Sequence, residues 1–89
     1  MQPFRGSILS GDKIILQDIE GYYEIVESQW GIKSWHGYFV LDSGFVNPDI
    51  DTLQFDDGRH GKIIISNASM GSNQPTTVQF KGSGPIEGP

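Results

Sequence analysis

The two histidines, His36 and His60, are the side chains best suited to chemistry near neutral pH, because an unperturbed imidazole titrates there. His60 follows Asp57 by three residues in an Asp-Asp-Gly-Arg-His segment, so a metal site or an acid–base pair is the chemistry to consider. A zinc site needs three or four convergent ligands, and the histidines and carboxylates here lack a diagnostic spacing. We therefore expect His60 to be an exposed turn residue and His36 to be a hydrogen-bonded strand residue. The sequence predicts no metal and no cofactor.

Motifs of nucleophilic or phosphate-transfer catalysis are missing from the sequence. Serine, histidine and aspartate are all present, but Gly-x-Ser-x-Gly and the glycine-rich phosphate loop are not. The aspartates also lack the spacing of a calcium-binding EF-hand loop. With zero cysteines, the chain has neither a thiol nucleophile nor a disulfide framework. The sequence therefore predicts a protein that is not an enzyme.

Aromatic residues are concentrated between positions 22 and 45. Alternation assigns Tyr23, Trp35 and Phe39 to the core, as expected for one face of a strand. The others form a candidate binding patch, since Trp and Tyr dominate interface energetics: Tyr22, Trp30, Tyr38 and Phe45. Trp30 precedes a glycine in a predicted loop, where it is either a lid over the core or an exposed binding residue. The lid is the favoured interpretation.

Charge is distributed unevenly along a chain whose net charge is −5. Residues 34–58 contain five aspartates and neither lysine nor arginine, and these aspartates form a candidate acidic rim: Asp42, Asp49, Asp51, Asp56 and Asp57. The rim is either ordinary solvated surface or a surface for a basic target. Nucleic-acid binding is not expected, because it usually requires a basic patch.

The elements that must position these residues are short strands. Gly and Pro interrupt the chain so often that at most nine consecutive residues lack them, whereas a typical helix has ~11 residues. Periodicity and turn residues predict strands over 4–9, 13–17, 22–27, 34–41, 52–56, 62–66 and 76–81, with hairpin turns at Gly11 and at Asp57-Gly58. Several carry apolar residues on both faces, which favours a closed or sandwiched sheet. We expect an all-β, SH3-like or OB-like antiparallel barrel of six or seven short strands, closed or partly open, with a two-sheet sandwich as the alternative.

The domain organisation expected from composition is a single barrel domain over 1–82 and a flexible Gly/Pro-rich tail over 83–89. The sequence has no secretory signal pattern and no apolar segment long enough for a membrane span. We therefore expect a cytoplasmic protein without membrane contacts. A barrel of this length has little room for a ligand cavity, so a small-molecule ligand is not expected.

Two function hypotheses remain. The first is a non-catalytic interaction module that binds a protein partner or its own copy through the aromatic patch or a strand edge. The second is a small acidic inhibitor or regulator that engages a basic target through the segment 42–57. Replacing exposed aromatic residues should abolish binding in the first case, and raising the salt concentration should do so in the second.

Overall fold

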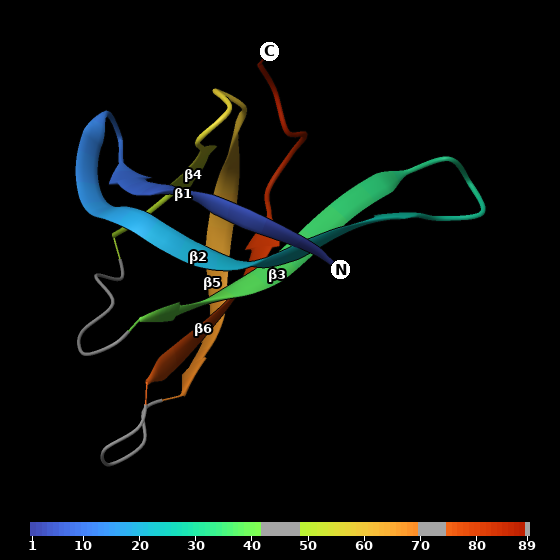
Figure 1. Cartoon of the computed structure of the whole chain (residues 1–89). Helices are drawn as coiled ribbons and strands as arrows, with labels where there is room; N and C mark the ends of the chain where they lie inside the picture. Colours follow the sequence, from blue (N-terminus) through green and yellow to red (C-terminus); the bar gives the residue numbers. More distant parts are fainter. Residues whose placement is uncertain (42–48, 70–74, 89) are drawn as a thin grey trace.

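A computed structural model describes residues 1–41, 49–69 and 75–88, which form an antiparallel barrel with no helical residue among them. The six strands are β1 (Gln2–Ser10), β2 (Lys13–Glu27), β3 (Lys33–Leu41), β4 (Thr52–Phe55), β5 (His60–Ser69) and β6 (Thr76–Gly82). Their order around the barrel is β1-β2-β3-β6-β5-β4, and β4 pairs with β1 to close it (Figure 1). The predicted all-β barrel is confirmed, rather than the two-sheet sandwich.

Two three-stranded units, β1–β3 and β4–β6, make up the barrel. They join where β1 pairs with β4 and where β3 pairs with β6. The hairpins predicted around Gly11 and around the Asp57-Gly58 turn are both present. Closure pairs the outer strands of the two units with each other, so the barrel itself has no free sheet edge along these pairings.

The strands predicted at 13–17 and 22–27 are one continuous strand, β2, and this part of the prediction is wrong. The polar stretch between them does not break the pairing with β1, although the register shifts near Gly6 and Ile8. Asp18 takes a positive φ of 53° in the same region. An irregularity of this kind bends a strand and increases its twist without ending it. The sequence pattern alone does not distinguish such a bend from a turn.

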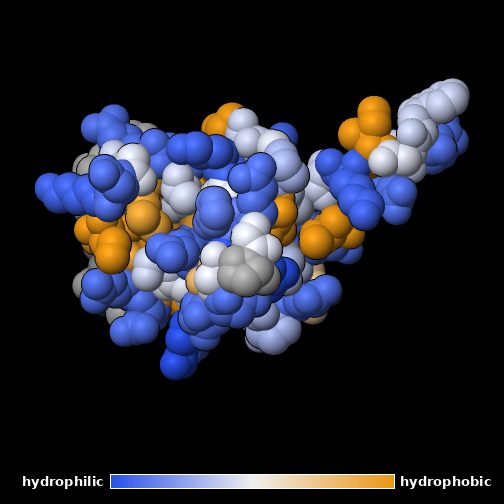
Figure 2. Space-filling view, turned by 90° about the horizontal axis from the view of Figure 1, so that it is seen from above, coloured by the Kyte–Doolittle hydropathy of each residue, from blue (hydrophilic) through white to orange (hydrophobic). Residues whose placement is uncertain are grey.

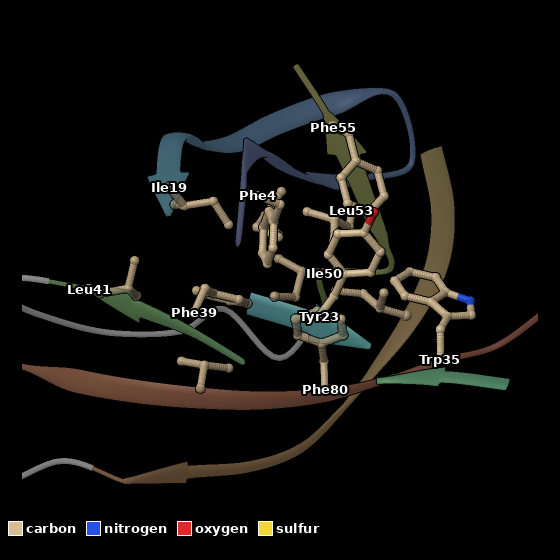
Figure 3. Packing of buried hydrophobic residues seen from close by; sticks show 13 residues of the cluster. Phe4, Ile19, Tyr23, Trp35, Phe39, Leu41, Ile50, Leu53, Phe55 and Phe80 are labelled. Carbon is tan, nitrogen blue, oxygen red and sulfur yellow. The ribbon is translucent and has the colours of Figure 1, made fainter. Parts of the chain in front are cut away.

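Aromatic side chains fill the barrel (Figure 3). Phe4 packs edge-on against Tyr23, Phe55 and Phe80, with ring centroids 5.6 to 6.2 Å apart. The core residues predicted by alternation, Tyr23, Trp35 and Phe39, are buried, and so are Leu53, Phe55, Val78 and Phe80. Of the three consecutive isoleucines on β5, Ile63 is buried and Ile64 is exposed.

The segment after β6 lies against the barrel. The indole Nε1 of Trp35 donates a 2.8 Å hydrogen bond to the carbonyl of Gly84, and Ile86 is partly buried against the core. His60 and Glu87 exchange two backbone hydrogen bonds of 2.8 and 2.7 Å. These contacts place residues 83–88 beside β5, whereas the flexibility expected of 83–89 remains a prediction.

Candidate functional site

The hairpin of β2 and β3 extends beyond the strands that flank it. The pairing of β2 with β1 ends at Tyr23, and the pairing of β3 with β6 ends at His36. Beyond these points β2 and β3 pair only with each other, up to Glu27 opposite Lys33. Residues 24–34 therefore form a two-stranded arm that projects from the barrel (Figure 1).

Apolar side chains on the arm are exposed. Trp30 is 79% exposed and Ile32 is 67% exposed, and Ile25 and Val26 are about half exposed. Figure 2 shows hydrophobic atoms on the part of the molecule that projects from the barrel. The interpretation of Trp30 as a lid over the core is wrong, because the arm has left the barrel before the chain reaches it.

The tip of the arm is ordered by its own hydrogen bonds. The amide of Ser28 donates to the carbonyl of Ile32 at 2.8 Å, and the amide of Gly31 donates to the carbonyl of Ser28 at 3.0 Å. The Ser28 hydroxyl accepts hydrogen bonds from the amides of Trp30 and Ile32, both at 3.2 Å. Gly31 has a φ of 80°, which glycine adopts without a steric penalty. The tip therefore holds Trp30 in a turn of defined geometry.

Both faces of the arm carry an apolar residue. Ile25 lies opposite Trp35 and shares the face of Tyr23, whereas Val26 lies on the opposite face. In a soluble two-stranded ribbon, one would expect at least one polar face. Neither face of this arm is therefore entirely polar.

Charged residues on the arm lie opposite one another. Glu24 Oε2 is 3.3 Å from Nε2 of His36, and Glu27 lies opposite Lys33 in the register. The histidine predicted to be a hydrogen-bonded strand residue is thus half-buried beside a carboxylate. The acids and bases of this hairpin therefore face each other in pairs.

The four residues of the predicted aromatic patch are not gathered in one place. Tyr22 and Tyr38 lie opposite each other at the base of the arm, with ring centroids 5.7 Å apart. Trp30 lies beyond Ser28, and the seven residues from Tyr22 to Ser28 span roughly 20 Å when extended. Phe45 lies outside the described residues. The tyrosine pair and the arm tip are therefore two separate surfaces.

The tyrosine pair borders a charged surface on the outer wall of β1 and β2. Arg5 pairs with Glu20, and both side chains are largely exposed. The hydrogen bond to Glu20 and the charge of Glu20 raise the pKa of Arg5, and the charges of Asp18 and Asp56 add to this effect. Glu20 thus pairs directly with this guanidinium, and two further carboxylates act on it through their charge.

The predicted acidic rim is divided between the two ends of β4. Asp51 precedes this strand and accepts hydrogen bonds from the Gly11 amide and from the Thr52 hydroxyl, the latter at 2.7 Å. Asp57 follows it and accepts a 2.8 Å hydrogen bond from Nε of Arg59. Asp49 and Asp56 are exposed, and Asp42 lies outside the described residues.

Two rim aspartates owe their pKa shifts to these internal bonds. The pKa of Asp51 is lowered, first by the Thr52 hydroxyl and then by the Gly11 amide. The pKa of Asp57 is lowered chiefly by the backbone amide of Arg59. Both carboxylates therefore stabilise turns of this fold, whatever else they contact.

The hypothesis of a metal or acid–base site around His60 gains no geometric support. Nε2 of His60 lies 4.0 Å from a Glu87 carboxylate oxygen, and Asp57 is engaged with Arg59. Within residues 1–41, 49–69 and 75–88, no group of three or more histidine, aspartate or glutamate side chains could hold a metal ion. The same residues include no helix long and apolar enough to cross a membrane.

Sequence reasoning did not identify Ile25, Val26 and Ile32 as part of a surface. The available signal was that Ile32 and Trp30 flank a glycine at a predicted turn. The exposure of these residues arises because β2 and β3 extend beyond β1 and β6. That extension depends on the register of all four strands and cannot be read from the sequence of one hairpin.

We compared the chain with protein-family models, with curated proteins and with solved structures, and no match was found in any of the three.

Proposed function

We propose that this protein is a non-catalytic interaction module that docks on a protein partner through the β2–β3 arm. The observation that carries the proposal is the exposure of Trp30 and Ile32 on an arm whose tip is ordered by its own hydrogen bonds. An exposed cluster of large apolar side chains typically marks an interaction site. A turn that is already ordered loses little conformational entropy on binding.

The form of the arm indicates the form of its partner. Ile25 and Val26 lie on opposite faces of the ribbon, so covering both requires an apolar cleft with two walls rather than a flat surface. The outer edges of residues 24–27 and 33–34 pair with no other described strand, so their backbone groups are available to the walls of such a cleft. Trp30 would then fill the closed end of the cleft, where a buried Trp commonly acts as a binding hot spot.

Affinity capture with matched variants tests this proposal. Ile32 and Ile64 are both exposed, at 67% and 61%, but Ile32 is on the arm and Ile64 is on the barrel wall. Trp30→Ser and Ile32→Ser should each reduce recovery of a stoichiometric partner at least tenfold, whereas Ile64→Ser should leave it unchanged. Equal recovery by all three variants would exclude the arm as the docking site.

A further inference from the structure

A shallow furrow runs along the outer wall of the barrel beside β2, from the tyrosine pair to Asp18. Its largest hollow has a volume of about 600 Å³ and contains Tyr22, Arg5 and Glu20 in its lining. Two further hollows continue it, since each shares residues with the first and both reach Asp18. The three hollows therefore adjoin one another along β2.

The two ends of the furrow differ in chemistry. At one end lie the rings of Tyr22 and Tyr38, tilted by 36° to each other, with Val40 exposed beside them. Toward the other end lie three carboxylates and the guanidinium of Arg5, which leaves an excess of two negative charges. Glu20 and Asp56 line the same hollow as the tyrosines, and Asp18 lies at the far end. A complementary ligand has an apolar ring at one end and positive charge at the other.

The separation of the two ends sets the spacing within the ligand. Tyr22 and Asp18 are four residues apart on β2, a span of about 13 Å in an extended strand. A polyproline II helix rises 3.1 Å per residue, so about four of its residues cover the same span. Proline rings pack well on tyrosine, and this helix loses little entropy on binding because it is already extended.

We infer that the furrow binds an extended, proline-containing peptide segment that carries Arg or Lys about four residues from the proline. This inference goes beyond the arm contact, because the tyrosine pair and the arm tip are separate surfaces. The proline would stack on Tyr22 and Tyr38. The basic side chain would reach the carboxylates around Arg5, where charge–charge attraction makes the affinity sensitive to ionic strength.

Fluorescence anisotropy with synthetic peptides tests the ligand chemistry. The probe is a fluorescein-labelled peptide with two prolines, a two-residue spacer and two arginines. We expect saturable binding that weakens as salt is added, and at least tenfold weaker binding when the arginines are replaced by glutamates or the spacer is removed. Lack of saturation at about 1 mM peptide, or equal binding of the glutamate peptide, would overturn the inference.

Protein variants test the location. Tyr22→Ser and Asp56→Asn should each weaken binding of the arginine peptide roughly tenfold, as expected for a central aromatic or charged contact. Ile32→Ser on the arm and Ile64→Ser on β5 should not change it. Amide NMR shifts on titration should map to residues 18–22 and 38–40. Shifts confined to the arm tip would contradict the inference. So would a protein that binds neutral oligosaccharides but does not bind the peptide.

Discussion

Trp35 occupies the space that a side chain at Gly82 would need. A Cβ built on Gly82 would lie 2.0 Å from Nε1 of Trp35, and one on Gly61 would lie 2.6 Å from the same indole. Trp35 sits where β3 leaves the barrel wall, and its Nε1 is bonded to Gly84. The indole thus fixes the base of the arm to β5, β6 and the segment that follows.

Gly82→Ala should destabilise the fold. The added methyl group collides with the buried indole, and overpacking of this kind typically costs about 1–3 kcal/mol. Urea unfolding followed by circular dichroism measures the change, with Ser83→Ala at the next, exposed position as the control. A midpoint equal to that of the wild type would show that Trp35 has room to move.

Arg59 covers one end of the aromatic core. Its guanidinium carbon lies 4.7 Å from the ring centroid of Phe55. One of its terminal nitrogens donates a 3.2 Å hydrogen bond to the hydroxyl of Tyr23. Arg59→Gln should lower the free energy of unfolding by about 1 kcal/mol through loss of the cation–π contact. Arg5→Gln, on the outer wall, should have a smaller effect. The reverse order of the two variants in thermal unfolding would contradict this role of Arg59.

Stability should fall on the acid side because of Asp51 and Asp57. A lowered pKa means that the folded state favours the ionised carboxylate, so the contribution is present above the unfolded value of about 3.8. It is lost as the pH falls through the lower folded-state pKa. Asp51→Asn should therefore flatten the stability profile below pH ~4.

The matched control for this pH dependence is Asp12→Asn. Asp12 lies in the β1–β2 turn next to Gly11, but its carboxylate takes part in neither hydrogen bond of Asp51. Its profile should keep the acid slope of the wild type. An unchanged slope in Asp51→Asn, measured by chemical unfolding between pH 2 and pH 6, would refute the assignment.

The two tryptophans should report opposite environments. Trp30 is exposed and Trp35 is buried, so Trp30→Phe should leave a blue-shifted emission that iodide quenches weakly. Trp35→Phe should leave a red-shifted emission that iodide quenches strongly. Trp30→Phe should also change the free energy of unfolding by no more than about 0.5 kcal/mol, because the residue packs on no core. Protection of Trp30 from iodide in the free monomer would contradict the exposed arm.

The fold was predictable from the sequence to the extent that local patterns determine it. Alternation identified Tyr23 and Phe39 as core residues, and the Asp57-Gly58 turn marked a hairpin, because both signals are local in the chain. The continuity of β2 was not predictable, since the bend at Asp18 has the same polar composition as a turn.

The candidate site was predictable only in part. The residue type at Trp30 suggested binding, but its exposure depends on where β1 and β6 stop pairing with the hairpin. Asp51 and Asp57 were grouped with an acidic rim because they share a charge and a region of sequence. The hydrogen bond from Gly11 to Asp51 joins residues 40 positions apart and has no local signature. The bond from Arg59 to Asp57 lies within one turn, but a shared charge does not reveal it.

Site-specific photo-cross-linking tests the role of the arm most directly. A benzophenone amino acid is placed at Trp30, where it preserves an aromatic ring, and in a second sample at Ile64 on the barrel wall. After irradiation in lysate of the source cells, we predict a discrete protein adduct from position 30 that is absent from position 64 and lost when Ile25 is changed to Ser. Adducts from position 64 alone, or from neither position, would contradict docking through the arm.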